Sequence, residues 1–215
     1  MIIEYLGHSC FKLTESTGTS IVCDPYSEEI VGYAMPSVDA DVVTVSHHHN
    51  DHDNIQKVGG TPAIIDRENN CDFDGVEINS IKSFHDASRG KKRGENMIFK
   101  FRMDGIDVCH LGDLGEQCSS DLIETLLPVN VLLIPVGGTY TVDAEMAKEY
   151  VDRIMPDIVI PMHYRTKDCK LDIDKVDEFL KLFDEDVIEE VDGNSIELSR
   201  TDLGEETKIV VLRRN

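Results

Sequence analysis

A short apolar segment that leads directly into a cluster of histidines is the feature that most restricts what this chain can fold into. Residues 41–46 (DVVTVS) have the composition of a buried strand, and four of the chain's eight histidines follow within residues 47–52. The pattern H-x-H-x-D-H is expected by chance in about one in a thousand chains of this composition. A rigid strand that ends in such a cluster can direct several side chains into one cleft, so we expect a functional site here.

The spacing inside this cluster predicts a metal centre. Because side chains alternate along an extended chain, His47 and His49 should point to one side and provide half of a tetrahedral site for zinc. Asp51 and His52 follow as the chain turns, and they can serve a second metal ion nearby. His48 should face the protein and support the loop. The alternatives are an affinity tag, which would sit at a terminus and lack Asp51, and a polar loop that binds no metal.

Other residues of metal-binding type also stand at the ends of apolar segments. They are His85 after residues 78–84, Asp113 after residues 108–110, and His163 after residues 158–162. One such residue alone would more often be an ordinary loop residue, but four strands that all end this way favour a centre with two divalent metal ions. Histidine and carboxylate ligands suit zinc, and manganese or iron also accept this set.

The pattern of apolar residues predicts strands first and helices later. Strand-like segments fill about the first 110 residues, with a hairpin turn at Asp104-Gly105. Helices are expected at 121–127, 143–154 and 173–183, strands at 131–136 and 158–162, and a closing hairpin at 196–198 and 209–212. Such layers without a linker indicate an α/β fold with one shared core, and therefore a single domain over residues 1–215.

The composition disfavours several functions. Forty-two acidic residues against 21 basic ones give a net charge of −21, so nucleic acid is an unfavourable partner, and the acidity is best explained by solubility or adaptation to high salt. The sequence has neither a signal-peptide pattern nor an apolar run of about 20 residues, so we expect no membrane association and a cytoplasmic location. Six cysteines without a C-x-x-C pair indicate reduced thiols, not a four-cysteine zinc site.

Together these residues resemble the metallo-β-lactamase fold superfamily, and the resemblance covers nearly the whole chain. The segment His47-x-His49-x-Asp51-His52 is similar to its signature motif, and Asp24 resembles its early strand-end aspartate. The later His, bridging Asp and final His of the family correspond in order to His85, Asp113 and His163.

Two further segments look more specifically like one branch of that superfamily. Gly7-His8-Ser9-Cys10 and Pro161-Met162-His163-Tyr164 resemble the branch that contains L-ascorbate-6-phosphate lactonase and small uncharacterised metal-dependent hydrolases. N-acylphosphatidylethanolamine phospholipase D is a more distant relative. These motifs are specific for the fold and the metal site, and they do not specify the substrate.

The resemblance implies a four-layer αββα sandwich with a binuclear site at one edge of its two sheets. The implied ligands of the first metal are His47, His49 and His85. The implied ligands of the second metal are Asp51, His52 and His163, with Asp113 bridging the two ions. Asp24 would brace the histidine loop by hydrogen bonds.

The implied activity is hydrolysis of a small ester, lactone or phosphodiester by a metal-activated hydroxide that Asp51 orients. His8 and His110 are candidates either for protonating the leaving group or for hydrogen bonding within the site, and the sequence does not choose between these roles. The basic run at residues 89–93 is either a clamp for a small anionic substrate or an exposed loop. Residues 137–140 are a candidate pocket wall.

Other functions are compatible with the motifs. An RNA- or DNA-processing nuclease of the same fold is disfavoured by the acidic surface and by the lack of a recognisable RNA-binding arm. A redox protein is disfavoured because flavodiiron proteins carry a fused flavin-binding domain, for which this chain has no room. The complete ligand set disfavours loss of the metal site, although a non-catalytic metal-binding protein would keep it. The sequence leaves homo-oligomer formation open.

Overall fold

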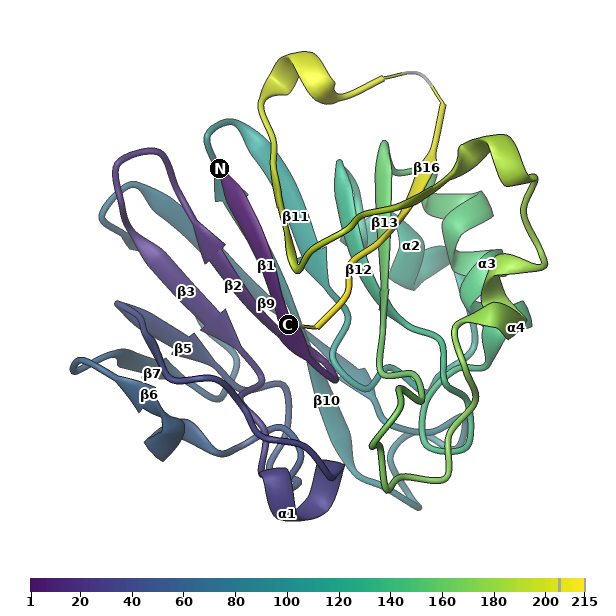
Figure 1. Cartoon of the computed structure of the whole chain (residues 1–215), viewed down its shortest axis with the longest axis horizontal. Coiled ribbons are helices and arrows are strands. Elements are labelled where there is room, and N and C mark those ends of the chain that lie inside the picture. The colour runs from purple at the N-terminus through teal and green to yellow at the C-terminus, as the bar shows by residue number, and fades with distance from the viewer. Residues whose placement is uncertain (205, 215) are drawn as a thin grey trace.

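Two β-sheets that face each other form the centre of the molecule (Figure 1). The computed structural model describes residues 1–204 and 206–214. The six-stranded sheet has the order β15-β1-β2-β3-β5-β7. Its strands are β1 (Ile2–Gly7), β2 (Cys10–Thr14), β3 (Ser20–Cys23), β5 (Val42–Thr44), β7 (Ala63–Ile65) and β15 (Ser195–Glu197). The strands β15, β1, β2 and β3 pair antiparallel, whereas β3, β5 and β7 pair parallel.

The eight-stranded sheet has the order β14-β16-β13-β12-β11-β10-β9-β8. Its strands are β8 (Asn70–Phe73), β9 (Val76–Phe84), β10 (Glu95–Met103), β11 (Ile106–His110), β12 (Val131–Pro135), β13 (Ile158–Met162), β14 (Ile188–Glu190) and β16 (Lys208–Val211). The pairs from β8 to β11 are antiparallel, and those from β11 to β14 are parallel. A small separate sheet consists of β4 (Val38–Asp39) and β6 (Val58–Gly59).

The main core lies between the two large sheets, because successive side chains of each strand point to opposite faces of its sheet. In β10, Phe99 and Phe101 belong to this central core, whereas Ile98 lies on the outer face under the helices. In β13, Ile160 faces the centre and Val159 faces outward. Both faces of the parallel half are covered, which explains why β12 and β13 are apolar along their whole length.

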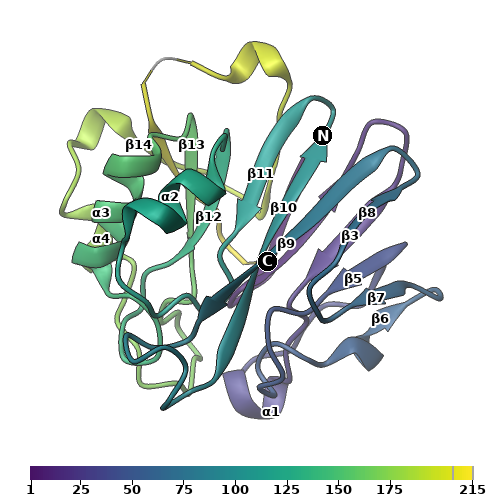
Figure 2. The ribbon, with the colours of Figure 1, turned by 180° about the vertical axis from the view of Figure 1, so that it is seen from behind.

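The two outer layers are unequal. The helices α2 (Ser120–Leu126), α3 (Ala144–Ile154) and α4 (Asp177–Leu180) cover the eight-stranded sheet, as Figure 2 shows from behind. In the described part of the chain, the six-stranded sheet is covered by α1 (Glu28–Val31), the small β4–β6 sheet and loop residues such as Tyr26 and Tyr33. Three short 3₁₀ helices, at Ile55–Lys57, Glu185–Val187 and Arg200–Asp202, lie in the connections. The expected αββα sandwich is confirmed, with one thick and one thin helical layer.

Local signals located most elements correctly. Asp104 and Gly105 have φ values of 51° and 73° and close the hairpin between β10 and β11, as expected for a two-residue turn. The helix α3 begins where the Asp143 side chain accepts a hydrogen bond from the Met146 N–H, and it ends at Ile154, before Pro156. These features depend on neighbouring residues, so the sequence shows them directly.

The helix expected over residues 173–183 was wrong in length, because only Asp177–Leu180 is α-helical. The Asp174 N–H donates to the carbonyl of Gly137, and its own carbonyl accepts from the Arg165 N–H. These contacts hold the start of the segment in a non-helical path that bridges two other loops. The expected apolar contact is nevertheless made, because Phe179 is fully buried against the sheet.

The closing hairpin expected at the end of the chain was also wrong. The strand β15 pairs with β1 in the six-stranded sheet, whereas β16 pairs with β13 and β14 in the other sheet. Both segments have the composition of strands, and their partners lie far away in the sequence.

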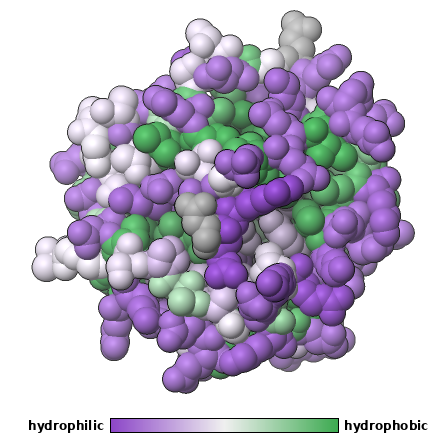
Figure 3. All heavy atoms as spheres, viewed as in Figure 1, coloured by the Kyte–Doolittle hydropathy of each residue, from purple (hydrophilic) through white to green (hydrophobic). Residues whose placement is uncertain are grey.

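Hydrophilic side chains cover most of the face drawn in Figure 3, with smaller hydrophobic areas between them. In the part of the chain that the structure describes, no helix is long and apolar enough to cross a lipid bilayer.

Candidate metal centre

Five connections that follow strands bring polar side chains together at one end of the two sheets. His8 follows β1, residues 47–52 follow β5, His85 follows β9, Asp113 follows β11 and His163 follows β13. Parallel strands end at the same edge of a sheet, and this edge is where ligands bind in many α/β folds. Loops from both sheets therefore contribute to one cluster.

Three sets of residues in the cluster have ligand atoms within 4.8 Å of one another; the third set, His47, His52 and Asp113, shares a residue with each of the other two, which have none in common. The first ligand group is His47, His49 and His85. The second ligand group is His8, Asp51, His52 and His163. His49 is exposed, and the Asp51 side chain is 16% exposed. The other members of both groups are buried, so the cluster reaches the surface past His49 and Asp51.

Asp113 lies between the two groups. Its Oδ2 is 3.3 Å from Nε2 of His85 and 3.3 Å from Nε2 of His163, and its Oδ1 is 3.1 Å from Nε2 of His52. Two ligands that each lie about 2.1 Å from one ion in tetrahedral geometry are about 3.4 Å apart. The separations around Asp113 are close to this value, so its carboxylate can contribute to both groups.

Asp24 sets the orientation of two histidines. Its Oδ2 accepts hydrogen bonds from Nδ1 of His52 at 2.8 Å and from the Ser46 hydroxyl at 2.6 Å. Because the Ser46 hydroxyl donates to Asp24, its oxygen accepts from Nδ1 of His47 at 2.9 Å. Both imidazoles therefore carry a proton on Nδ1 and turn Nε2 toward the cluster, as metal-binding histidines do. The expected hydrogen-bonding role of Asp24 is confirmed.

Ser46 and Asn96 support the site and were not found from the sequence. The buried amide of Asn96 accepts a hydrogen bond from the Asp113 N–H at 2.9 Å. Gly112 allows this approach, because a Cβ there would lie 2.4 Å from Asn96 Oδ1, and its φ of 56° also favours glycine. The available signal is that Asn96 is a polar residue at a buried position of the alternating strand Glu95–Met103.

Buried polar atoms that lack hydrogen-bond partners gather in this cluster. Among the described residues they include Nε2 of His47, His52 and His163 and Oδ1 of Asp113. Leaving one such atom unsatisfied costs about 1–3 kcal/mol. Divalent cations would contact these atoms together, so the residues fit a metal centre.

The charges of the cluster also suit cations. Burial lowers the pKa of His47 to about 3 and that of His8 to about 4, so both imidazoles are neutral at pH 7 and have a lone pair to offer. Burial opposes ionisation of Asp113, but interaction with His163 and His52 prevails and holds its pKa well below the usual value. Burial likewise disfavours charge on His52, but Asp113 and Asp51 raise its pKa well above the usual value. The carboxylates thus draw positive charge into a buried space.

The position expected for His48 was wrong. Its side chain is 62% exposed, and its Nδ1 contacts Oδ2 of Asp53 at 2.7 Å. The strand β5 ends at Thr44 and the His52 N–H bonds to the carbonyl of His49, so the chain turns where strand alternation was assumed. His48 therefore lies on the solvent side of the loop, where it contacts Asp53.

His110 is buried outside both ligand groups, and both of its ring nitrogens are occupied. Its Nε2 donates to the carbonyl of Ser9 at 2.8 Å, and its Nδ1 accepts from the Gly112 N–H at 3.2 Å. Of the two roles that the sequence left open, this geometry favours hydrogen bonding over protonation of a leaving group. His8, the other candidate, lies within the second ligand group.

The basic loop, residues 89–93, is ordered around Asp86. The Asp86 carboxylate accepts three hydrogen bonds from backbone N–H groups of residues 88–93. The guanidinium of Arg93 donates to the carbonyl of Thr139 at 3.3 Å and lies 4.6 Å from the centre of the Tyr140 ring. The structure thereby joins two segments that the sequence indicated separately as substrate-binding candidates.

Comparison with known proteins shows the family to which this chain belongs. A family model described as a beta-lactamase superfamily domain matches residues 2–163. A UPF0173 metal-dependent hydrolase from Methanoculleus marisnigri is 32% identical over 189 residues, which cover 77% of this chain and 82% of that protein.

Solved structures show the same relationship. A protein from Thermotoga maritima, described as a Zn-dependent hydrolase of the metallo-β-lactamase superfamily, has a TM-score of 0.81 and 42% identity, covering 98% of this chain and 97% of its own. An isothiocyanate hydrolase from Delia radicum gut bacteria has a TM-score of 0.68 and 16% identity over 93% of this chain and 100% of its own, which shows a common fold alone. The finer likeness to the lactonase branch stays a prediction. The chain belongs to the metallo-β-lactamase superfamily and is a metal-dependent hydrolase.

Proposed function

We propose that this protein hydrolyses a small ester, lactone or phosphodiester at a binuclear centre, with one divalent ion in each ligand group. The observation that carries the proposal is the position of Asp113. Its oxygens lie 3.3 Å from His85 of the first group and 3.1 Å and 3.3 Å from His52 and His163 of the second. A carboxylate shared between two ligand groups suits a two-metal hydrolytic site.

The donor atoms support zinc as the resident metal. The proposed ligands are His47, His49, His52, His85, His163, Asp51 and Asp113. Imidazoles dominate this set, which suits zinc, while manganese and iron accept the same donors. When bound, such ions lower the pKa of water toward neutrality and polarise the bond to be cleaved.

The exposed members of the cluster give the direction from which substrate enters. His49 is exposed and the Asp51 side chain is 16% exposed, whereas His52 and His163 have no exposed surface. Substrate and water therefore approach past His49 and Asp51. The Asp51 carboxylate would accept a hydrogen bond from the attacking water and orient it.

The basic loop supports an anionic substrate. The chain has a net charge of −21, yet four of residues 89–93 are basic and follow His85 closely. Arg93 is half-buried, and its contacts with Thr139 and Tyr140 hold the guanidinium in place. A planar guanidinium pairs well with phosphate or carboxylate, so we propose that Arg93 contacts an anionic group of the substrate.

Metal analysis and an activity screen test this function. Protein purified without chelator should contain about two divalent ions per chain. After metal reconstitution it should hydrolyse at least one member of a panel of lactones, phosphodiesters, carboxylic esters and thioesters. Clearly less than one ion per chain would contradict the binuclear centre, and a fully loaded protein without turnover on the panel would contradict the substrate class.

Variants connect this activity with the cluster. Asp51→Ala and His163→Ala should each abolish hydrolysis while far-ultraviolet circular dichroism stays unchanged. His48→Ala is the matched control, because it also removes a polar side chain of the histidine loop but one that faces solvent. Equal activity in His163→Ala and His48→Ala would place the chemistry elsewhere.

A further inference from the structure

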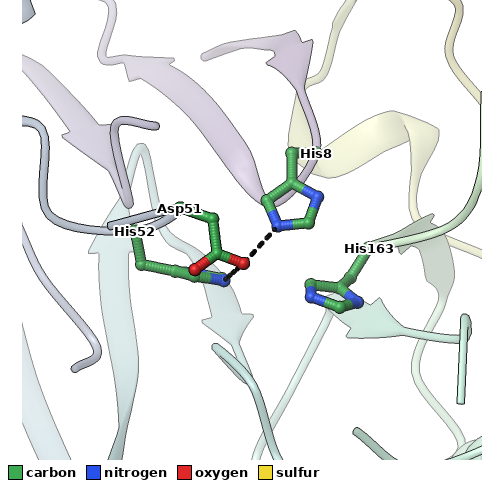
Figure 4. Close-up of side chains that lie close together, drawn as sticks. All are labelled: His8, Asp51, His52 and His163. Atoms are coloured by element: carbon green, nitrogen blue, oxygen red, sulfur yellow. Dashed lines mark hydrogen bonds and ion pairs between the residues drawn. The ribbon is translucent and has the colours of Figure 1, made fainter. Parts of the chain in front are cut away.

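The turn between β1 and β2 inserts His8 into the second ligand group. Its side chain has no exposed surface and converges with Asp51, His52 and His163, as Figure 4 shows. We propose that Nε2 of His8 is a further protein ligand of the metal ion held by these three residues. The inference rests on the proposed binuclear centre and adds a ligand from outside the H-x-H-x-D-H motif.

The separations around His8 are those of ligands that share one ion. Nε2 of His8 lies 3.3 Å from Oδ2 of Asp51, and Nε2 of His52 lies 3.6 Å from the same oxygen. Neighbouring ligands of one ion are about 3.0 to 3.6 Å apart when each bond is about 2.1 Å long and the angles lie between about 90° and 120°. One ligand atom from each of the four residues lies within 4.8 Å of the others, so a single ion can contact the whole group.

An ordinary hydrogen bond explains the contact between His8 and Asp51 less well. Two short imidazole–carboxylate hydrogen bonds within the described residues allow a comparison. They are His52 Nδ1 to Asp24 Oδ2 at 2.8 Å and His48 Nδ1 to Asp53 Oδ2 at 2.7 Å. Charge-assisted bonds usually have this length. The 3.3 Å between His8 and Asp51 matches instead the 3.3 Å that separates Asp113 from His85 and from His163.

The ring packing around His8 also matches that of the first ligand group. The His8 ring centroid lies 4.3 Å from that of His163 and 5.1 Å from that of His52. In the first group the corresponding separations are 4.5 Å for His47–His49, 4.7 Å for His47–His85 and 5.1 Å for His49–His85. The His8 ring is thus spaced from its two neighbours as the rings of the first group are, whereas the rings of His52 and His163 lie 5.8 Å apart.

The backbone of the turn holds His8 in this position. The His163 N–H donates to the His8 carbonyl at 3.0 Å, and His110 donates to the Ser9 carbonyl at 2.8 Å, so the eight-stranded sheet anchors a turn of the other sheet. His8 has a φ of 56°, in the left-handed region that is unfavourable for residues other than glycine. At Gly7, an added Cβ would lie 2.8 Å from the Tyr26 hydroxyl oxygen. Unfavourable backbone held by surrounding contacts is typical of functional sites.

A ligand at His8 would separate the roles of the two ions. If Asp113 contributes to both ions, the second ion has five protein ligands (four plus Asp113) and the first has four (three plus Asp113). The second ion would then be closed by protein. The first, beside exposed His49, has fewer protein ligands and more room for water and substrate.

Cobalt binding to His8 variants tests the proposal. His8→Gly removes the imidazole and suits the backbone, because glycine readily adopts a φ of 56°. We expect the wild-type chain to bind two Co²⁺ ions and His8→Gly to bind one of them at least about tenfold more weakly in chelator competition. The visible spectrum of that ion should change, and added imidazole should restore both the spectrum and the affinity. His48→Ala should bind both ions like the wild type.

A second variant separates a ligand from a hydrogen-bond donor. The side-chain amide of His8→Gln can still donate to Asp51, but it is a poor replacement for a metal-binding imidazole. We expect His8→Gln to lose affinity for one ion as His8→Gly does. Wild-type affinity and spectrum in either variant would overturn the proposal.

A metal-loaded crystal structure of the unaltered chain provides a check that needs no substitution. We expect Nε2 of His8 about 2.1 Å from an ion, whereas a distance above about 3 Å would overturn the proposal. A wild-type chain that binds fewer than two ions would instead overturn the binuclear centre itself. The two failures are therefore distinguishable.

Discussion

The two ligand groups of this hydrolase are built differently, although one loop supplies residues to both. The first group consists of three imidazoles, and His49 among them is exposed. The second group combines three imidazoles with the carboxylate of Asp51, and its members His8, His52 and His163 have no exposed surface. The first group thus consists of imidazoles alone and is open, whereas the second includes a carboxylate and is mostly enclosed.

This difference shows how neighbouring residues can prepare unlike sites for two ions. A carboxylate in buried surroundings attracts a cation strongly, because little water is present to screen it. An imidazole group that reaches the surface gives water and substrate access to its ion. We therefore expect the second ion to be held more firmly and the first to face the substrate.

Loss of the carboxylate between the groups should have the largest effect. Asp113→Asn removes the negative charge that both groups share, so we expect metal analysis to show loss of both ions and kinetic assays to show loss of hydrolysis. Asp53→Asn is a suitable control, because Asp53 contacts the exposed His48 outside the cluster. If Asp113→Asn keeps one ion at wild-type affinity, Asp113 belongs to a single group and its carboxylate is not shared by the two ions.

A matched pair of substitutions should test the two ligand groups one at a time. Each substitution weakens a hydrogen bond that orients a histidine of one group. Asp24→Asn weakens the direct support of His52, and we expect the affinity of the second ion to fall by about 10- to 100-fold. Ser46→Ala removes the hydrogen bond to Nδ1 of His47, and the larger loss should then fall on the first ion. Chelator competition with cobalt measures both affinities. Equal losses of both ions in both variants would show that the groups do not respond separately.

The smallest expected effect concerns the entrance beside the first group. Arg93→Gln removes the held guanidinium of the basic loop, and we expect the KM for an anionic substrate to rise about tenfold, as for the loss of one hydrogen bond to a charged group. The KM for a neutral analogue should stay unchanged. Lys91→Gln, at an exposed position of the same loop, is the control. Equal effects of Arg93→Gln on anionic and neutral substrates would contradict a role in anion binding.

The candidate ligands could be found from the sequence because each carries a local signal. His47, His85, Asp113 and His163 are polar residues that follow the ends of apolar strands within three residues, and the structure brings them into one cluster. The side of the chain on which His48 lies was predicted wrongly. Alternation holds only while the backbone is extended, and β5 ends before the histidines begin.

The sequence by itself determined which amino acids make most segments of the two sheets strand-like, which faces of those strands are apolar, and which residue types are available for metal binding. These properties follow from neighbouring residues and from the periodicity of a strand. Only the tertiary structure decided the partners of β15 and β16, the short length of α4 and the place of His8. Each of these depends on contacts between distant segments, such as the hydrogen bond from His163 to the carbonyl of His8. For this reason the sequence left the role of His8 open, and the fold places it within the second ligand group.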